Sequence, residues 1–321
     1  MIGRILVPLD RSALAERALS HAVEIAKRCG AELRLLHAWE PFPLPQGEFV
    51  ENAVHDIDQR QREEATQYFD GVADWIRGGA GVVVETTLLD GSAAAVIHAE
   101  AVRWRADLIV MSTHGRTGWS RVWLGSVADR VVRHATTPVF LVRASDAAAA
   151  RPSPRPRGVL VPLDGTTQGE EILEPLLALL EVFSPEVTLL RVVRPVRTPQ
   201  YVSTLGMPVL YPDQESTVLA IREARSYLDR IASRLRQALP ALRVTTRVEV
   251  DESASAAIVA ASAECDLVAM ATHGRGATRL VLGSVADKVM RGTDADLLLR
   301  RRLEDAPSAE REAQRAAVGA G

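Results

Sequence analysis

Short apolar runs alternate with amphipathic stretches along the whole chain. Residues 5–9 form a nearly all-apolar run, which is typical of a strand covered on both faces. An apolar stripe at helical spacing follows, between a capping residue, Ser12, and a terminating glycine, Gly30. The same pattern predicts strands at 32–38, 82–89, 107–111 and 137–142, helices at 55–77, 92–105 and 126–133, and a proline-rich loop at 41–45. Strands alternating with helices indicate parallel βαβ units.

This pattern occurs twice. RILVPLD at 4–10 returns as GVLVPLD at 158–164, and THGR with GSVAD at 113–129 returns at 272–287. The fold class predicted is α/β: two tandem doubly wound, mostly parallel five-stranded sheets with helices on both faces. We expect one domain at 1–145 and another at 158–303, joined by an Ala-, Pro- and Arg-rich linker at 146–157 and followed by a mobile tail at 304–321.

Bulk composition narrows the function only by exclusion. The chain is 47% hydrophobic and 25% charged, with a formal net charge of −3, which argues against nucleic acid or an acidic membrane surface as the main partner. No apolar run reaches the roughly 18 residues of a membrane span. Met1 leads almost at once into a predicted strand, so we expect no signal peptide and a cytoplasmic location. Cys29 and Cys265 do not match in the repeat, and packing is favoured over a disulfide or metal site.

Repeated polar residues gather where the predicted strands end, which is where open doubly wound sheets bind ligands. They are Asp10 and Asp164 after the first strand, His114 and His273 after the fourth, and Gly125-Ser126 and Gly283-Ser284 at the start of the next helix. A helix start offers unpaired N–H groups and a partial positive charge, and glycine lets an oxygen-rich ligand approach. A nearby carboxylate can accept hydrogen bonds from a ribose or base. The pattern therefore favours a nucleotide site.

Purely structural roles for the same residues are alternatives to the nucleotide site. Ser126-Val-Ala-Asp129 and Ser284-Val-Ala-Asp287 are also helix-capping patterns, and an Asp at a strand end is commonly a turn residue. The repeated histidines could bond to the loop backbone, and the unrepeated ones (His21, His37, His55, His98 and His134) are interpreted as incidental. No P-loop, Gly-x-Gly-x-x-Gly, HExxH, CxxC or Gly-x-Ser-x-Gly pattern occurs, so no catalytic or metal-ligating residue is assigned.

Both repeats resemble the universal stress proteins in their tandem two-domain form, over residues 3–142 and 158–301. Members that bind ATP carry Gly-x-x-Gly, nine residues, then Gly-Ser/Thr after the fourth strand. In the first repeat Ser112 replaces the first glycine of this pattern. In the second repeat Ala271 replaces it, and only eight residues separate Gly274 from Gly283.

The resemblance implies that each repeat holds an adenine nucleotide, ATP with or without Mg²⁺. Asp10 and Asp164 would contact the adenosine, the backbone at Ala38 and Val192 would meet the adenine edge, and the glycine loop would hold ribose and phosphates. The residues it assigns are Pro8, Leu9, Asp10, Ala38, Met111, Ser112, His114, Gly115, Arg116, Gly125, Ser126 and Val127, with Pro162, Leu163, Asp164, Val192, Met270, Ala271, His273, Gly274, Gly283, Ser284 and Val285. The shortened second loop predicts a weaker second site, so Asp10→Ala should weaken ATP binding more than Asp164→Ala.

We therefore expect an ATP-binding stress-response regulator, a nucleotide-dependent switch or sensor and not an enzyme. A nucleotide-independent interaction protein of the same fold stays open, because the glycine pattern is broken at residues 112 and 271. An enzyme of the wider adenine-nucleotide α-hydrolase group is a third possibility. Family members pair through the fifth strand, so the apolar edges at 137–143 and 295–301 predict an intramolecular pseudo-dimer. A homodimer of whole chains and an unidentified protein partner also stay open.

Overall fold

The computed structural model describes residues 1–40, 48–113, 124–143, 154–202, 207–272 and 283–301. The first repeat contains β1 (Arg4–Pro8), α1 (Ala13–Cys29), β2 (Glu32–Trp39), α2 (Glu48–Ala80), β3 (Val84–Asp90), α3 (Ala93–Arg103), β4 (Leu108–Ser112), α4 (Ser126–His134) and β5 (Val139–Val142). The second contains β6 (Gly158–Pro162), α5 (Thr167–Glu170), α6 (Leu173–Phe183), β7 (Glu186–Val193), β8 (Arg197–Val202), β9 (Met207–Pro212), α7 (Gln214–Ala238), β10 (Val244–Val250), α8 (Ala254–Ser262), β11 (Leu267–Ala271), α9 (Ser284–Gly292) and β12 (Asp296–Arg300). The expected proline-rich loop at 41–45, residues 146–153 of the expected linker and the expected tail lie outside the described residues.

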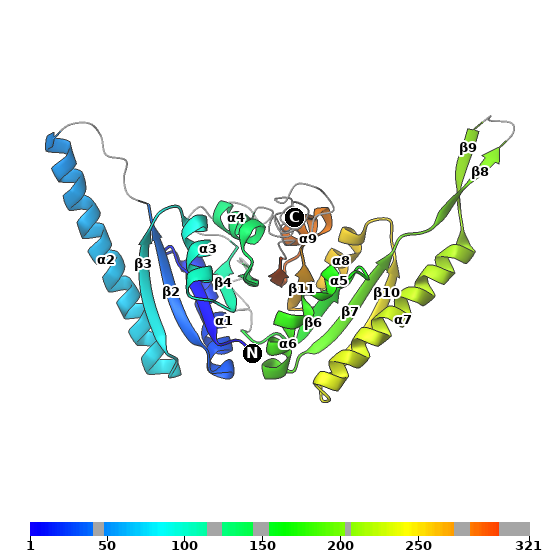
Figure 1. The fold of residues 1–321 in the computed structure, drawn as a ribbon, viewed down its shortest axis with the longest axis horizontal. Coiled ribbons are helices and arrows are strands. Elements are labelled where there is room, and N and C mark those ends of the chain that lie inside the picture. Colours follow the sequence, from blue (N-terminus) through cyan, green and yellow to red (C-terminus); the bar gives the residue numbers. More distant parts are fainter. Residues whose placement is uncertain (41–47, 114–123, 144–153, 203–206, 273–282, 302–321) are drawn as a thin grey trace, which may run out of the picture.

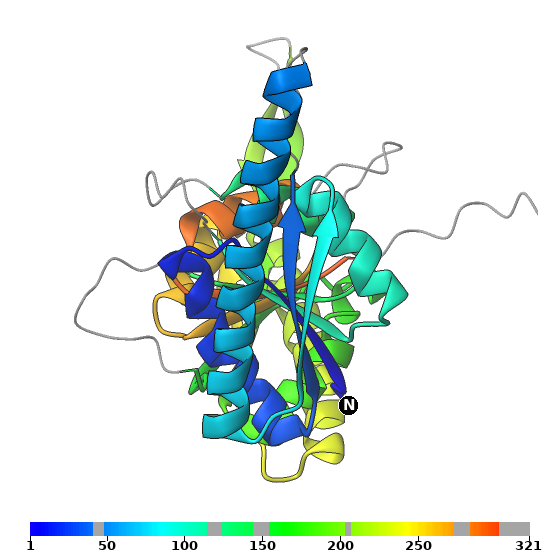
Figure 2. The ribbon, with the colours of Figure 1, turned by 90° about the vertical axis from the view of Figure 1, so that its left-hand side faces the viewer.

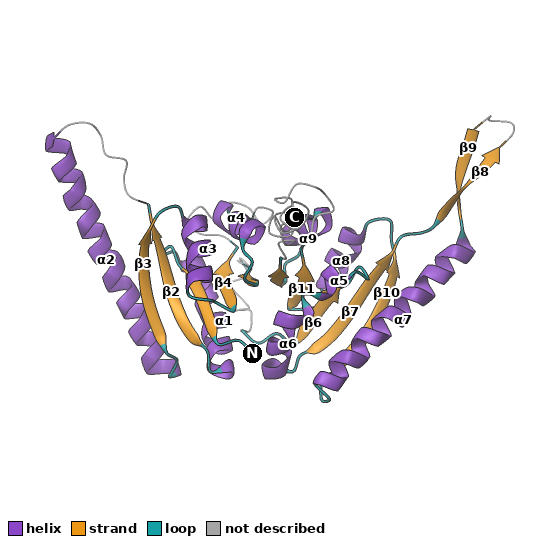
Figure 3. Ribbon diagram, viewed as in Figure 1, coloured by secondary structure: helices purple, strands orange, loops and turns teal. Residues whose placement is uncertain are grey.

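One sheet runs through the described part of both repeats (Figure 1). Its ten strands lie in the order β10-β7-β6-β11-β12-β5-β4-β1-β2-β3. In this ten-stranded sheet every pairing inside a repeat is parallel, so the doubly wound α/β fold is confirmed. The two five-stranded sheets that we expected are joined into a single layer (Figure 3).

The join is made by the two fifth strands. β5 and β12 pair antiparallel, with Phe140 opposite Leu298, as the apolar edges predict. Both side chains are almost completely buried. Pairing two otherwise exposed strand edges satisfies their backbone groups and makes one core of the two halves.

Helices cover both faces of this sheet. Apolar side chains of α1, α2, α6 and α7 pack into one cluster, and those of α3, α4, α8 and α9 pack into the other. Each cluster draws residues from both repeats, so the core is continuous across the join. α2 and α7 flank opposite ends of the sheet (Figure 1), and in the side view α2 extends beyond the ends of β2 and β3 (Figure 2).

A capping serine and a terminating glycine set the two ends of α1, as the sequence predicts. Ser12 caps α1, its hydroxyl accepting a hydrogen bond from the Ala15 amide at 3.1 Å. Gly30 ends the helix with a φ of 68°, a left-handed conformation that suits glycine. α2 is longer than expected, since it starts at Glu48 and not at His55.

The second repeat departs from the plan of the first in two places. The hairpin β8–β9 is inserted after β7 and was not predicted, and in Figure 1 it extends away from the sheet beyond α7. The first helix of this repeat is also divided into α5 and α6. Thr166 caps α5, its hydroxyl accepting a hydrogen bond from the Gly169 amide at 3.0 Å.

Polar contacts also cross the join. His21 on α1 lies 3.2 Å, Nε2 to Oδ2, from Asp296 on β12, so the interpretation of His21 as incidental is wrong. Asp296 also accepts a 2.8 Å hydrogen bond from the Arg143 amide, and the Arg143 guanidinium donates to the carbonyl of Met290. These contacts tie the end of β5 to the second repeat.

Four charged residues of α4 and α9 form an ion-pair ring across the same join. Arg133 contacts Asp129 at 2.7 Å and Asp287 at 3.1 Å, and Arg291 contacts Asp287 at 3.1 Å and Asp129 at 3.6 Å. The hydrogen bond from Arg291 is the main cause of a lowered pKa of Asp287. A carboxylate with a lowered pKa adds stability at neutral pH, and that contribution is lost as pH falls through the lowered pKa.

Removing one charge from this ring should weaken the join modestly. We expect Asp287→Asn to lower the free energy of unfolding by about 0.5–1 kcal/mol in 0.1 M salt, since the ring is partly exposed and screened. Urea unfolding at 0.1 M and 1 M NaCl measures it, and the loss should shrink at high salt. Asp74→Asn removes an exposed pair with Arg77 within α2 and serves as the control without effect. A loss that is independent of salt would contradict the electrostatic explanation.

Among the described residues, no helix combines the length and apolar character needed to cross a bilayer. Cys29 and Cys265 are both free, and burial raises the pKa of each thiol.

Candidate functional site

The strand order places a candidate site in each repeat. In the second repeat β6 lies between β7 and β11, and in the first repeat β1 lies between β2 and β4. The chain crosses from one side of β6, or of β1, to the other, so the strand order reverses there. A crevice opens beyond the carboxyl ends of the strands at such a point, and ligands bind in it.

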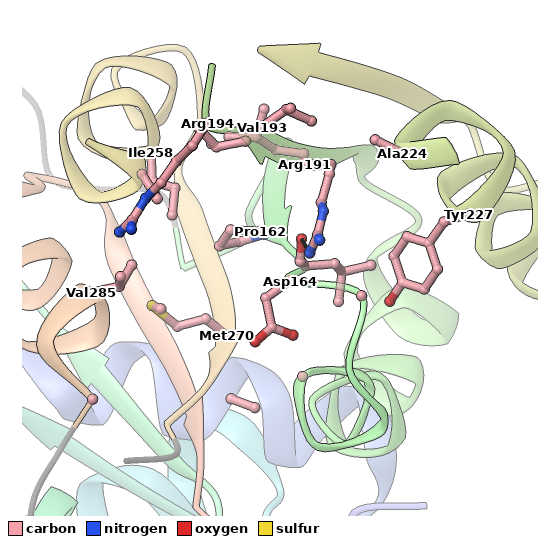
Figure 4. A pocket seen from close by; sticks show the side chains of 18 of the residues that line it. Pro162, Asp164, Arg191, Val193, Arg194, Ala224, Tyr227, Ile258, Met270 and Val285 are labelled. Atoms are coloured by element: carbon pink, nitrogen blue, oxygen red, sulfur yellow. Dashed lines mark hydrogen bonds between the residues drawn. The ribbon is translucent and has the colours of Figure 1, made fainter. Parts of the chain in front are cut away.

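The second repeat has a pocket of about 860 Å³ at this point (Figure 4). That volume lies within the roughly 300–1,000 Å³ typical of small-molecule sites. Every described residue that the sequence assigns to the second site lines this one pocket: Pro162, Leu163, Asp164, Val192, Met270, Ala271, Gly283, Ser284 and Val285. The sequence therefore predicts a set of residues that the fold brings together.

Asp164 lies in the pocket at the end of β6 and also makes a turn. Its Oδ1 accepts from the backbone amide of Thr166 at 3.0 Å and from the Thr166 hydroxyl at 2.5 Å. Asp10 does the same in the first repeat, where Ser12 donates from its amide at 3.0 Å and its hydroxyl at 2.6 Å. The turn interpretation of both residues is therefore correct as local structure. It leaves room for a ligand role, because a carboxylate has acceptor positions on both oxygens.

The start of α9 forms another wall of the pocket. Gly283 is the N-cap residue and, having no side chain, makes no capping bond, and Ser284 is the first helical residue. α4 starts in the same way, with Gly125 before Ser126. The capping interpretation of Ser126-x-x-Asp129 and Ser284-x-x-Asp287 is therefore wrong, since both aspartates belong to the ion-pair ring. A helix start without a side-chain cap keeps its amides available to an anion.

Sequence reasoning missed four pocket residues with polar or charged side chains. Arg191 lies in β7 and Arg194 directly follows it, and Glu223 and Tyr227 come from α7. Burial, aided by the charge of Glu170, raises the pKa of the Tyr227 hydroxyl, which therefore stays protonated at neutral pH. A repeat signal could have found Tyr227, because Glu-Ala-x-x-Tyr occurs at 64–68 and again at 223–227. The arginines are not repeated, and a search for repeated residues passes over them.

The first repeat builds the corresponding region with different partners. His37 is buried, and its Nδ1–H donates to the Leu9 carbonyl at 2.8 Å. Arg191 holds the matching place in the second repeat, where its guanidinium donates to the Leu163 carbonyl at 3.2 Å. His37 is thus a structural residue and not an incidental one. Tyr68 donates to Glu16 at 2.6 Å, and burial and this bond raise the pKa of its hydroxyl.

The remaining first-site residues lie at the expected strand and helix ends. Pro8, Leu9 and Asp10 end or follow β1, Ala38 is in β2, Met111 and Ser112 end β4, and Gly125, Ser126 and Val127 begin α4. The Gly125 amide donates to the Thr113 carbonyl at 2.8 Å, which ties the start of α4 to the end of β4. His114, Gly115, Arg116, His273 and Gly274 lie outside the described residues.

Relatives of known sequence match one repeat at a time. A universal stress protein of Thermus aquaticus is 38% identical over 145 residues, covering 44% of this chain and 100% of that protein. One from Methanocaldococcus jannaschii is 34% identical over 143 residues, covering 44% of this chain and 81% of that protein. The crystal structure of a universal stress protein from Archaeoglobus fulgidus matches with a TM-score of 0.64 at 18% identity, covering 94% of this chain and 97% of that one. The structural match supports the fold alone.

The fold and the pocket define a class: a two-repeat, doubly wound α/β protein with a small-molecule pocket at the carboxyl ends of its strands. The model of the universal stress protein family matches the chain twice, over residues 1–143 and 156–301. The chain belongs to the universal stress protein family, as the repeated motifs predict.

Proposed function

We propose that this chain is a nucleotide-binding regulator that holds ATP in the pocket of its second repeat. The observation that carries the proposal is the convergence of nine sequence-assigned residues on one pocket at the switch point of the sheet. The pocket combines apolar walls from Met270, Val285 and Ile258 with a carboxylate and an uncapped helix start. Mostly apolar walls with a few fixed polar groups are typical of cofactor sites.

The two polar ends of the pocket suit the two ends of a nucleotide. The amides at the start of α9 and the helix dipole favour phosphate oxygens. Asp164 is held in place by Thr166 and supplies an acceptor for the hydroxyls or amino group of the nucleoside. A site with one anion-binding end and one acceptor end therefore fits a nucleoside phosphate better than an apolar ligand.

A regulatory role fits the residues better than catalysis. The described pocket residues do not include a cysteine or a serine–histidine pair. Within the described ranges there is also no cluster of three or more metal-ligating side chains. Mg²⁺, where it takes part, would therefore enter on the phosphates, as is usual for this ion. ATP binding at α9 would act next to the ion-pair ring, which gives it a route to the join between repeats. A cytoplasmic location stays a prediction.

Calorimetric titration of the full chain with ATP tests the proposal. Asp164→Asn should weaken ATP binding roughly tenfold, because a neutral acceptor makes a weaker hydrogen bond than a charged one while the amide oxygen still accepts from Thr166. Asp251→Asn is the matched control: Asp251 ends β10, accepts from the Ser253 amide at 2.7 Å, and does not line the pocket. No heat and no thermal shift at millimolar ATP would reject the proposal.

An interaction role without nucleotide is the second candidate, and one observation favours it. Leu210 and Tyr211 on β9 and Val218 and Leu219 on α7 are exposed apolar side chains next to the projecting hairpin. Exposed apolar side chains that lie close together on a surface are typical of protein-binding sites. Partner binding that is unchanged by ATP, by Asp164→Asn and by removal of bound nucleotide would favour this candidate.

A further inference from the structure

The two repeats can be compared position by position around their sites. Pro8 on β1 is paired with Leu36 on β2, and Pro162 on β6 is paired with Leu190 on β7. The register is the same in both repeats, so a residue that follows Leu36 by a given number has its counterpart at that number after Leu190. The loop after Asp10 corresponds in the same way to the loop after Asp164.

Three of these matched positions differ in charge. Arg11 corresponds to Gly165, His37 to Arg191, and Glu40 to Arg194. With His37 neutral, the three positions are together more positive by two elementary charges in the second repeat. The acidic residues that line the second pocket, Asp164 and Glu223, do not account for this difference, because Asp10 and Glu64 match them in the first repeat.

Arg191 is built into the pocket. Its guanidinium donates to the Leu163 carbonyl at 3.2 Å and lies against Gly165, where an added Cβ would come within 3.2 Å of two guanidinium nitrogens. Gly165 also has a φ of +79°, which disfavours other residues. The glycine thus makes space for this arginine, and Figure 4 shows the side chain pointing toward Asp164. Its charge is therefore fixed at the nucleoside end of the pocket.

Arg194 serves the other end. It is exposed, lines the pocket, and in Figure 4 extends along the side on which Val285 and Ile258 lie. Val285 belongs to the first turn of α9, whose amides form the anion-binding end. A guanidinium here can add charge-assisted hydrogen bonds to phosphate oxygens. Glu40, at the matching position of the first repeat, would repel the same oxygens.

We infer that the second pocket selects nucleotides with two or three phosphates and that Arg194 determines this selectivity. The first site, with Glu40 in that place, favours nucleotides with fewer phosphates. The inference rests on the proposed function and assigns the two sites different ligands. It also reverses, for ATP, the ranking that the shortened second loop suggests, because charge at the phosphate end outweighs the length of the loop.

Titration of the full chain with ATP, ADP and AMP tests the inference, with Arg194→Glu as the variant that reproduces the charge of the first repeat. We expect ATP affinity at the second site to fall about tenfold to hundredfold and AMP affinity to change less than about threefold. Arg243→Glu is the control for net charge, because this residue is exposed at the opposite ends of the strands. Glu40→Arg should raise the ATP affinity of the first site.

Nucleotide binding at the two sites can be measured separately in the same molecule. All five tryptophans lie in the first repeat, at positions 39, 75, 104, 119 and 123. Tryptophan fluorescence therefore follows the first site, with Trp39 closest in sequence to Glu40, whereas calorimetry records both sites. If the wild-type chain binds no nucleotide, the proposed function and the inference both fail. If it binds ATP but Arg194→Glu weakens ATP and AMP equally, or weakens neither, the inference alone fails.

Discussion

Replacing Phe140 with alanine is expected to lower the free energy of unfolding by about 3–5 kcal/mol, the usual cost of truncating a buried phenylalanine. Phe140 is 3% exposed and lies opposite Leu298 at the centre of the pairing between β5 and β12. Its ring also lies 5.9 Å from the ring of His21. The substitution therefore opens a cavity at the point where both halves share one core.

Urea unfolding followed by tryptophan fluorescence and by far-ultraviolet circular dichroism measures this effect. Fluorescence reports the first repeat alone, whereas dichroism reports both, so a shared core predicts that the two signals lose stability together. Ile57→Ala on the exposed side of α2 is the control and should cost less than about 0.5 kcal/mol. A cost below about 1 kcal/mol for Phe140→Ala would mean that the join adds little to the stability of the molecule.

Glu100→Ala is expected to cost about 3 kcal/mol, because it removes the buried one of the two carboxylates that pair with a poorly solvated guanidinium. The Glu100 side chain is 1% exposed and accepts from Arg34 at 2.6 Å, and the Arg34 side chain is only 13% exposed. Hydrogen bonds from Arg34 to both Glu85 and Glu100 raise the pKa of its guanidinium against the opposing effect of burial. Arginine is not deprotonated in proteins, so the guanidinium keeps its charge after Glu100 is removed.

The second repeat supplies the matched control for this prediction. Thr188 and Thr245 pair on β7 and β10 where Arg34 and Glu85 pair on β2 and β3, with their hydroxyls 3.2 Å apart. The sequence repeat matches Glu100 with an alanine of α8, at position 261. The triple variant R34T/E85T/E100A should therefore be more stable than E100A in urea unfolding. If the triple variant is the less stable of the two, the cost of E100A does not come from the charge of Arg34 that Glu100 no longer compensates.

The features of the fold that could be predicted are those that depend on residues close together in the sequence. α1 begins and ends at Ser12 and Gly30 because a capping hydroxyl and a left-handed glycine act within one turn of the helix. The join follows from two apolar edge strands that could not stay exposed. The hairpin β8–β9 was missed because Pro199, Pro208 and Pro212 lower the strand signal of its sequence.

The GSVAD motif shows the limit of prediction from neighbouring residues, because its Ser-x-x-Asp pattern was wrongly interpreted as a helix cap. Ser-x-x-Asp fits a helix cap, although an arginine four residues further on pairs with each aspartate in the structure. The partner of Asp287 that no local pattern could indicate is Arg133, 154 residues away and in the other repeat. Only the antiparallel pairing of β5 and β12 brings these side chains together.

The candidate site divides in the same way. Two features of the site could be predicted because both repeats contain them: Asp164, and the glycine that precedes α9. Arg191 and Arg194 could not, because the first repeat has His37 and Glu40 at these positions and the arginines are therefore not part of the repeated pattern. Repetition identifies what the two sites have in common, whereas the features that distinguish the two sites lie at positions where the repeats differ.

The pairing of β5 with β12 inside one chain has a consequence for how alike the two sites must be. Two separate identical chains that meet along such a seam must present the same chemistry twice. Here both halves belong to one polypeptide, so residue 40 can be acidic while residue 194 is basic. The two sites therefore stay in a one-to-one ratio at any dilution while their lining residues differ.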